Sequence, residues 1–441
     1  MPGSCREPPS LDAEQEKAFA AAASAWPGGA YDAFGYNTAQ EALDGYAAFH
    51  AHSLSAKAQE RKSLVFVPNQ YGLGNRLRAM KASLLIAMLT GRVFHVRWDE
   101  PFPVHALLKP ERIDWRLPEE DGRGALPVAQ PGSRSSDAAA QILCLPFATA
   151  PPGADCSSGL VALQQENLRE KYAAVSVLEV HTFTDLNIYL HTNPHYEELL
   201  ARFGATCPKR MGCLYDFLFS PQPVVRERLD ALLPTAPSEE YYGVQVRNRL
   251  WHMERTKLPG GRLPDGRPAD VSPGRVVQCM SLYVPPDATV FFTADDDALY
   301  RPAKALWGAR LLSVDGGVFM PWSRGGKVDA STLGADDEQA VLKAVVDWFA
   351  LRRASRIVYT YQSSFGKTAA EASDAPNVDV NQTRCVLAEQ RWSLRAGGDG
   401  AAAARDGATA VTQWEYEWSH AGDGVAYDVS MVPGARGSAI R

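Results

Sequence analysis

Arg247 is the residue whose type and position indicate chemistry most directly, because it ends GVQVR, a short segment of strand character. A guanidinium at the end of a strand can hold two phosphate oxygens through parallel hydrogen bonds. From Arg247 through Arg275 there are seven arginine or lysine residues and three acidic residues, although the whole chain carries a net charge of −6. This local excess of positive charge favours a polyanionic ligand. A solvated basic loop over residues 255–275 is the alternative.

Two further segments have the composition of anion-binding sites at the start of a helix. GLGNR at residues 72–76 lies between a predicted strand and a predicted helix, where glycines let the backbone approach a ligand and free N–H groups favour an anion. SSFG at residues 363–366 places hydroxyl and backbone N–H groups in the same situation. A tight turn in the first segment, or an ordinary serine N-cap in the second, explains the same residues without a ligand.

Three consecutive acids, Asp295, Asp296 and Asp297, follow the apolar segment 290–293. We consider three interpretations of this position. The carboxylates can accept hydrogen bonds from a nucleobase or a ribose, they can hold a divalent metal as an Asp-x-Asp pair does, or they can cap a helix that begins near Ala298. The sequence leaves these interpretations open.

The elements that position these segments alternate between strand and helix. Residues 64–67 and 93–98 are predicted strands, and the helix between them has apolar residues at helical spacing and Gly91 as its C-cap. Further strands are predicted at 242–247, 290–293, 311–314 and 356–361, with a helix starting at Asp336 or Asp337 and ending at Arg353. This alternation predicts an α/β fold with parallel sheets, in which ligands bind beyond the carboxyl ends of the strands.

The 441 residues divide into four predicted regions. They are an N-terminal helical extension (1–60), a first α/β domain (61–235), a second α/β domain (236–392), and a linker with a C-terminal tail (393–441). Residues 117–160, rich in Pro, Gly and Ser, are predicted to form a long insertion or loop. The seven cysteines lack zinc-binding spacings; Cys207 with Cys213, and Cys144 with Cys156, can close small loops, or these residues are buried thiols.

Several classes of function are disfavoured by composition and by absent motifs. The negative net charge argues against a surface that coats nucleic acid. The chain has no HExxH, GxSxG or Walker motif, which disfavours zinc proteases, serine hydrolases and P-loop enzymes. No apolar run reaches the roughly 20 residues of a membrane span, and the N-terminus lacks a secretory pattern, so we expect a soluble chain without a membrane anchor.

The motifs together resemble those of the GT-B fucosyltransferases. YGLGNRLRAMKASLLIAMLTGRVFHVRW is similar to their opening motif, GVQVRN to the arginine motif that acts on the donor diphosphate, and DWFALRRASRIVYTYQSSFGKTAA to their last motif. The helix and strand that lie between the arginine motif and the last motif in that family resemble VVQCMSLYVPPDATVFFTADDDAL. Gln245 and the SSFG loop are most similar to plant xyloglucan-type α-1,2-fucosyltransferases. The resemblance covers residues 63–115 and 240–375. Asn248 and Arg249 depart from relatives in which an Asp follows shortly, and the family's anchor helix is missing.

The resemblance implies a GT-B fold, two Rossmann-like domains facing a central cleft. It also implies transfer of fucose from GDP-fucose to a glycan or glycoprotein hydroxyl, with inversion and without a metal or a cofactor beyond the donor. Arg247 would bind the β-phosphate, Asp295 and Asp296 would lie near the guanosine, and the SSFG loop would line the diphosphate and sugar. A Golgi location follows by resemblance, while the sequence alone leaves a cytoplasmic one open. The predicted donor-binding residues are Gly72, Gly74, Asn75, Arg76, Arg247, Asp295, Asp296, Ser363, Ser364 and Phe365.

An inverting transfer develops charge on the β-phosphate, which makes Arg247 a candidate catalytic residue. Asp185 and His181 in VHTFTDLN are candidates for accepting the acceptor proton, with ordinary structural roles as the alternative. Two other functions stay open. One is a metal-dependent nucleotide-sugar transferase that uses Asp295 and Asp297. The other is a glycan-binding relative without catalytic activity.

Overall fold

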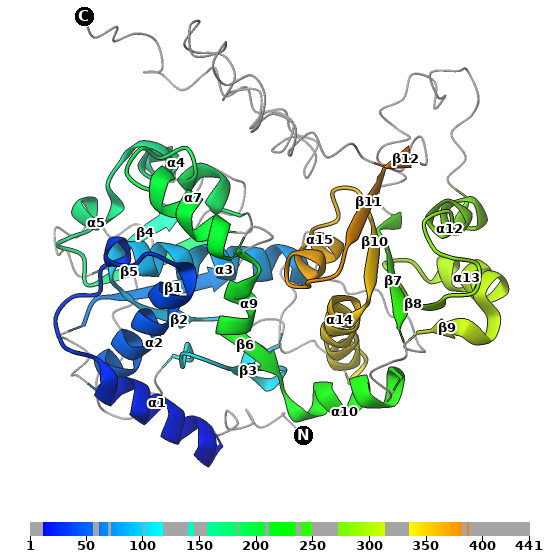
Figure 1. The fold of residues 1–441 in the computed structure, drawn as a ribbon, viewed down its shortest axis with the longest axis horizontal. Helices are drawn as coiled ribbons and strands as arrows, with labels where there is room; N and C mark the ends of the chain where they lie inside the picture. Colours follow the sequence, from blue (N-terminus) through cyan, green and yellow to red (C-terminus); the bar gives the residue numbers. More distant parts are fainter. Residues whose placement is uncertain are drawn as a thin grey trace, which may run out of the picture.

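The computed structural model describes residues 12–55, 61–68, 72–99, 102–117, 140–144, 157–182, 185–207, 211–234, 240–248, 272–313, 335–381 and 386–387. These residues form two α/β halves that lie side by side, each built around its own mainly parallel sheet (Figure 1). The predicted α/β class is therefore confirmed.

The sheet of the first half has the order β2-β1-β5-β4, and all its neighbouring strands are parallel. The predicted strand-helix-strand unit is confirmed as β1, α3 and β2. Helix α3 ends at Gly91, whose φ of 61° suits a residue without a side chain, and whose N–H bonds the last carbonyls of the helix. The bounds are β1 Ser63–Pro68, α3 Leu73–Thr90, β2 Val93–Val96, β4 Ala140–Cys144 and β5 Val177–Thr182.

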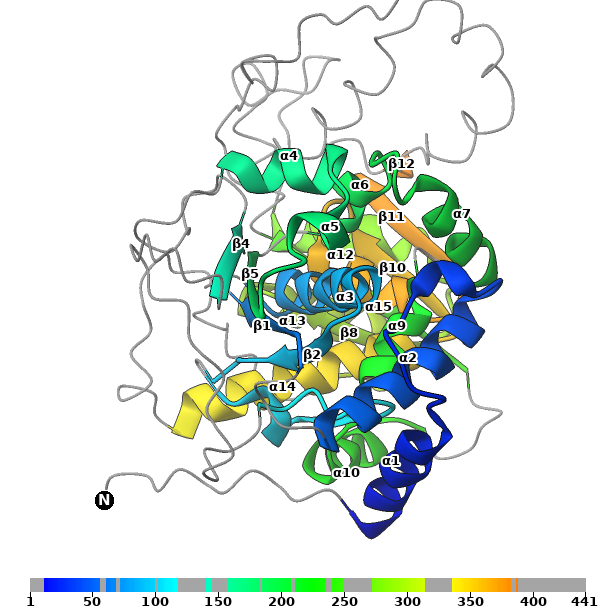
Figure 2. The same cartoon turned by 90° about the vertical axis from the view of Figure 1, so that its left-hand side faces the viewer.

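Helix α3 lies at the centre of the first half, as Figure 2 shows from that side, and Asn75 is its only residue that is not buried. Strand β4 and the first residues of α4 lie inside the stretch 117–160, so the loop prediction was wrong for residues 140–144 and 157–160. The surrounding elements are α1 Ala13–Ala25, η1 Ala33–Gly35, α2 Ala39–Ser55, η3 Val104–Ala106, β3 Leu108–Pro110, α4 Ser157–Gln165, α5 Leu168–Lys171, α6 Asn187–Leu190, α7 Glu197–Thr206, α9 Cys213–Leu218, β6 Phe219–Pro221 and α10 Pro223–Leu232.

The sheet of the second half has the order β12-β11-β10-β7-β8-β9, with only the β12 pairing antiparallel. The strand order reverses between β7 and β10, which makes this pair the topological switch point of a doubly wound sheet. The predicted strands are present, and Val314 lies outside the described residues. The bounds are β7 Tyr241–Val246, α12 Pro273–Ser281, β8 Thr289–Ala294, η5 Asp297–Leu299, α13 Tyr300–Trp307, η6 Gly308–Arg310, β9 Leu311–Leu312, α14 Ala335–Arg353, β10 Arg356–Thr360, α15 Ser364–Glu371, β11 Asn377–Asn381 and β12 Val386–Leu387.

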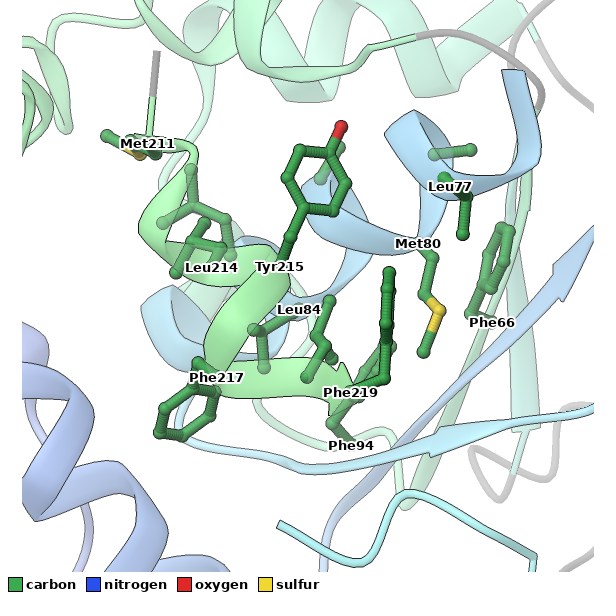
Figure 3. Packing of buried hydrophobic residues seen from close by; sticks show 14 of the residues in the cluster. Phe66, Leu77, Met80, Leu84, Phe94, Met211, Leu214, Tyr215, Phe217 and Phe219 are labelled. Atoms are coloured by element: carbon green, nitrogen blue, oxygen red, sulfur yellow. The ribbon is translucent and has the colours of Figure 1, made fainter. Parts of the chain in front are cut away.

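One hydrophobic core runs from the first half into the second. Tyr215 and Phe219 lie beside Met80 and Leu84 of α3 (Figure 3), and the Tyr215 ring also meets the Trp348 ring of α14 edge-on at 5.7 Å. This shared packing fixes α3 relative to α14 and α15. Among the described residues, no helix has the length and apolar character needed to cross a membrane.

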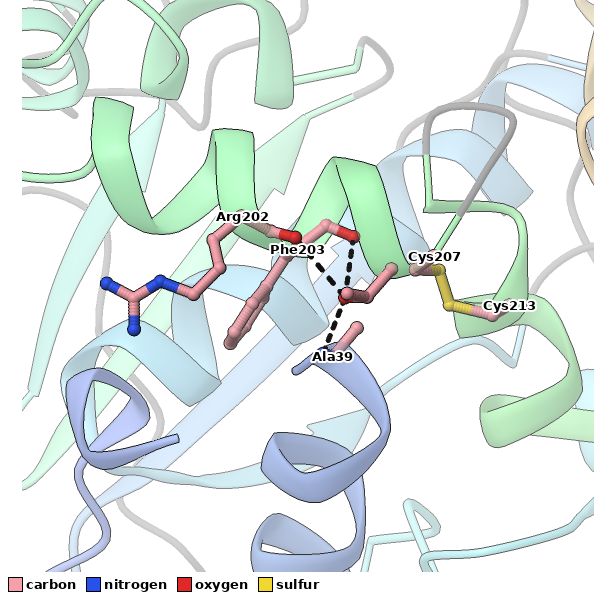
Figure 4. The surroundings of a disulfide bond; sticks show 6 residues. Ala39, Arg202, Phe203, Cys207 and Cys213 are labelled. Carbon is pink, nitrogen blue, oxygen red and sulfur yellow. Dashed lines mark hydrogen bonds between the residues drawn. A yellow bond between two sulfur atoms is a disulfide. The ribbon is translucent and has the colours of Figure 1, made fainter. Parts of the chain in front are cut away.

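Of the two alternatives for Cys207 and Cys213, the structure has the disulfide, which joins the end of α7 to the start of α9 (Figure 4). The neighbouring Thr206 Oγ1 accepts a hydrogen bond of 2.8 Å from the Ala39 N–H at the start of α2. Cys144 and Cys279 are disulfide-bonded as well. Cys156, with which Cys144 could close a small loop, lies outside the described residues.

Two buried histidines make the fold sensitive to acid. His50 of α2 donates from Nε2 to the Phe94 carbonyl at 2.9 Å, and burial lowers the pKa of His50 to about 4 and that of His95 to about 3. The unfolded chain therefore binds protons below about pH 6.5 that the folded chain excludes, so stability falls as the pH drops.

We expect His50→Gln to reduce this acid sensitivity, because glutamine keeps a donor for Phe94 but does not titrate. Between pH 7 and pH 5 the free energy of unfolding should fall by about 2 kcal/mol less in His50→Gln than in the unchanged chain. Urea titrations at both pH values measure the difference, with the exposed His52→Gln on the same helix as control. An unchanged pH slope in His50→Gln would show that this ring does not govern acid stability.

Candidate functional site

The switch point of the second sheet brings Arg247 and the SSFG loop together, because β7 and β10 are adjacent parallel strands. The backbone N–H of Arg247 donates to Thr360 Oγ1 at 2.9 Å, and the Thr360 carbonyl accepts from the Ser363 N–H at 3.0 Å. Two hydrogen bonds thus fix the end of β7 to the start of α15. In open α/β sheets this is the position at which ligands bind.

The Arg247 side chain is partly exposed and pairs with an acid from the neighbouring strand. Its Nε lies 3.0 Å from Asp295 Oδ2, and the other carboxylate oxygen accepts from the Asn248 N–H at 2.6 Å. No residue that the structure describes bonds the two Nη groups of Arg247. The guanidinium is therefore held on one side and has two donor groups left for an anion.

Asp296 and Asp297 have different surroundings from Asp295. Asp296 is the N-cap of η5, where it accepts from the Ala298 N–H at 2.9 Å, and it also accepts from the Asn248 side-chain amide. Asp297 is exposed in the same turn. The capping interpretation therefore describes Asp296. In the described part of the chain, no group of three or more His, Cys, Asp or Glu side chains is arranged to hold a metal ion.

Helix α15 starts with a cap and with free donors at the same time. Ser363 is the N-cap, and its Oγ accepts from the Gly366 N–H at 3.4 Å, as the N-cap interpretation predicts. Gln362 before it has a φ of 66°, which turns the chain sharply between β10 and the helix. The backbone N–H groups of Ser364 and Phe365 have no acceptor among the described residues. Two donors of this helix start are thus available to an anion.

Gly74 brings the first half against this helix start. A Cβ on Gly74 would lie 2.5 Å from the Phe365 nitrogen and 2.6 Å from the Ser364 carbonyl carbon, whereas nothing lies within 4 Å of a Cβ on Gly72. The backbone that Gly74 allows to approach is therefore that of α15 in the second half. Gly74, in the first turn of α3, consequently lies against the SSFG loop, and the donor-binding role of Gly72 stays a prediction.

Asn75 and Arg76 belong to the same turn of α3, and both make contacts within the first half. Asn75 Oδ1 accepts from an Arg78 Nη group at 3.0 Å. Arg76 is buried, and its guanidinium lies over the Trp98 ring, 5.2 Å from the ring centre. The donor-binding roles of these two residues stay predictions.

Gly74→Ala should destabilise the fold by about 1–3 kcal/mol, because the added methyl group meets backbone atoms that have no rotamer with which to move aside. Chemical denaturation measures the loss. Gly204→Ala in α7 is the matched control, since a Cβ there meets nothing within 4 Å and alanine favours a helix by about 0.5–1 kcal/mol. Equal effects of the two substitutions would contradict a close contact at Gly74.

Asp185 lies in a buried cluster of charges between the two halves. Lys81 Nζ of α3 lies 2.9 Å from Glu371 Oε2 at the end of α15 and 3.7 Å from Asp185 Oδ2. Burial raises the pKa of Asp185, but the nearby Lys81, Arg78 and Lys367 outweigh burial and hold that pKa below its usual value. A carboxylate so strongly held in its charged form is a weak proton acceptor, which favours the structural role for Asp185.

His181 has an acidic neighbour that the sequence did not single out. Its Nε2 lies 3.1 Å from Oε2 of Glu179, a buried residue on the same strand, and Glu179 Oε1 accepts from an Arg97 Nη group at 3.2 Å. The sequence signal that could have identified Glu179 is an acidic residue inside the otherwise apolar segment SVLEVHT, because acidic residues are rarely buried. These residues lie near the carboxyl end of β5, next to the end of β1.

The comparison with solved structures supports the two-half architecture. A variant of Arabidopsis thaliana FUT1 in complex with GDP is similar, with a TM-score of 0.54 and 14% identity over 78% of this chain and 80% of that one. The fucosyltransferase NodZ from Bradyrhizobium (0.41, 12% identity, 72% and 96% covered) and POFUT1 in complex with GDP-fucose (0.38, 13%, 73% and 98%) are more distant. No family model matches the sequence, and the search of curated proteins finds no match. The fold is GT-B-like.

Proposed function

We propose that this chain is a glycosyltransferase that transfers fucose from GDP-fucose to a hydroxyl group of a glycan or glycoprotein, with inversion and without a metal ion. One observation carries the proposal: Arg247 and the start of α15 share a hydrogen-bonded frame at the switch point, with Gly74 of the other half against it. The two Nη groups of Arg247 and the backbone N–H donors of α15, gathered at one place, suit a diphosphate held between two lobes.

The identity of the donor is proposed from two likenesses. The sequence motifs resemble those of GT-B fucosyltransferases, and the FUT1 variant of similar fold is in complex with GDP. These two likenesses support guanosine diphosphate and fucose. The nearer resemblance to plant xyloglucan-type α-1,2-fucosyltransferases, with a role in cell-wall glycans, belongs to the same proposal.

In the proposed reaction the acceptor oxygen attacks the sugar C1 from the face opposite the diphosphate. The bond from C1 to the β-phosphate oxygen breaks, its electron pair stays on that oxygen as GDP leaves, and the hydroxyl proton passes to a base or to solvent. The Nη groups of Arg247 would stabilise the charge that develops on the β-phosphate. Asp295 already forms an ion pair with Arg247 and accepts a hydrogen bond from the Asn248 N–H, which supports the metal-free form of the reaction over one in which Asp295 holds a metal.

A Golgi location is part of the proposal. The Cys207–Cys213 disulfide, and those at Cys144 and Cys279, support folding in an oxidising compartment such as the secretory pathway.

Incubation of the purified chain with GDP-fucose and a panel of glycan acceptors tests the function. We expect GDP release and a fucosylated product of opposite anomeric configuration, both unchanged by EDTA. Loss of activity with EDTA would favour the metal-dependent transferase. No GDP release with any acceptor, combined with glycan binding that Arg247→Ala leaves intact, would favour a glycan-binding protein without catalytic activity.

A further inference from the structure

Asp295 contacts three consecutive residues at the end of β7. Its backbone N–H donates to the Val246 carbonyl at 3.3 Å, its Oδ2 lies 3.0 Å from Arg247 Nε, and its Oδ1 accepts from the Asn248 N–H at 2.6 Å. The side chain is only 11% exposed. The carboxylate thus ties the backbone and the guanidinium of neighbouring residues to the end of β8.

The side on which Asp295 binds Arg247 determines what the guanidinium can still do. A guanidinium has five N–H groups in a planar fork, and it binds phosphate best through two parallel bonds. Asp295 forms an ion pair on the Nε side of the guanidinium, and no described residue bonds the Nη groups. The ion pair therefore limits the rotation of Arg247 while it leaves the Nη edge for an anion.

A second set of contacts holds Asp295 in place without any ligand. Asn248 is buried, and its side-chain amide donates to Asp296, which also caps η5 through the Ala298 N–H. These hydrogen bonds join the turn after β7, which contains Asn248, to the turn after β8, which contains Asp295 and Asp296. The orientation of Arg247 is consequently built into the fold before a ligand arrives.

We propose that Asp295 is a positioning residue that acts on the donor diphosphate through Arg247. This inference rests on the proposed function, and it replaces the expectation that Asp295 lies against the guanosine. A positioning role predicts that the contribution of Asp295 to binding disappears when Arg247 is absent. A contact with the guanosine predicts a contribution that does not depend on Arg247.

A double-mutant cycle read by calorimetric titration separates these roles. We expect Asp295→Asn to weaken binding of GDP and of inorganic pyrophosphate by about tenfold each, because the negative charge that holds the Arg247 guanidinium in place is lost. In the Arg247→Ala background the same substitution should change neither affinity. Asp287→Asn, at the exposed opposite end of β8, is the matched control and should bind GDP normally.

Three outcomes would overturn the positioning role. The first is that Asp295→Asn leaves pyrophosphate binding unchanged and that its loss of GDP affinity adds to that of Arg247→Ala in the double variant. The second is that Asp295→Asn binds GDP more tightly than the unchanged chain. The third is that neither Asp295→Asn nor the more drastic Asp295→Ala changes the affinity. The second would show that the ion pair holds Arg247 away from the ligand. The unchanged chain is titrated first, because a failure to bind GDP would overturn the proposed function together with the inference. The other outcomes concern Asp295 alone.

Discussion

Replacing Arg247 by alanine should lower the rate of fucose transfer at saturating substrate by about 10²–10³, or about 3–4 kcal/mol of barrier. The side chain is fixed by Asp295 and Thr360 holds its backbone, so its Nη groups meet the developing phosphate charge without reorganisation. Arg247→Lys should recover part of the rate, because it keeps the charge but loses the planar fork.

The rate constant kcat for GDP release in the presence of acceptor measures this effect. Arg301→Ala, an exposed arginine of α13 in the same half, is the control and should leave kcat unchanged. A kcat of Arg247→Ala within about threefold of the unchanged chain would rule out a charge-stabilising role for the guanidinium, since one such group is worth far more.

Lys81→Met should destabilise the protein by about 3–5 kcal/mol, because it leaves Asp185 and Glu371 without their counter-charge. The Lys81 side chain is 0% exposed and each carboxylate only 7%. Burial alone lowers the pKa of Lys81, yet Asp185 and Glu371 reverse this and raise the pKa above its usual value, so the ammonium is charged in the folded state. The free energy of unfolding from guanidinium titration measures the loss.

An exposed ion pair of the same chain provides the control for Lys81. Lys171 Nζ lies 2.5 Å from Glu166 Oε2, with side chains 31% and 39% exposed. Water solvates these charges, so Lys171→Met should change stability by no more than about 1 kcal/mol. Similar losses in the two variants would mean that burial does not set the strength of the Lys81 cluster.

Local signals in the sequence were enough for the elements that carry the site. The spacing of apolar residues and Gly91 located α3, and the apolar segments before Arg247 and before the three acids located β7 and β8. The short spacing of Cys207 and Cys213 allowed their disulfide but left buried thiols equally open. Each of these features depends on residues within one element or one loop. The α/β class followed from their alternation.

The contacts between distant segments could not be predicted in the same way. From the sequence, Gly74 was predicted to bind a ligand, whereas in the structure it packs against the backbone of Phe365. Lys81 contacts Glu371, which lies 290 positions further along the sequence. The pairing of Arg247 with Asp295 likewise depends on β7 and β8 being neighbours in the sheet, which their order in the chain does not determine. Propensity and spacing describe single elements, whereas these contacts depend on how the elements pack.

We propose that Arg247 holds a nucleoside diphosphate between the two halves. A thermal-shift screen across GDP, GDP-fucose, UDP-sugars and CMP-sugars, run on the unchanged chain and on Arg247→Ala, tests this role, because a ligand that binds only the folded state raises Tm. We predict a higher Tm with GDP and GDP-fucose, and loss of that shift in Arg247→Ala. A response to UDP-sugars alone, or a GDP shift that survives in Arg247→Ala, would contradict the account.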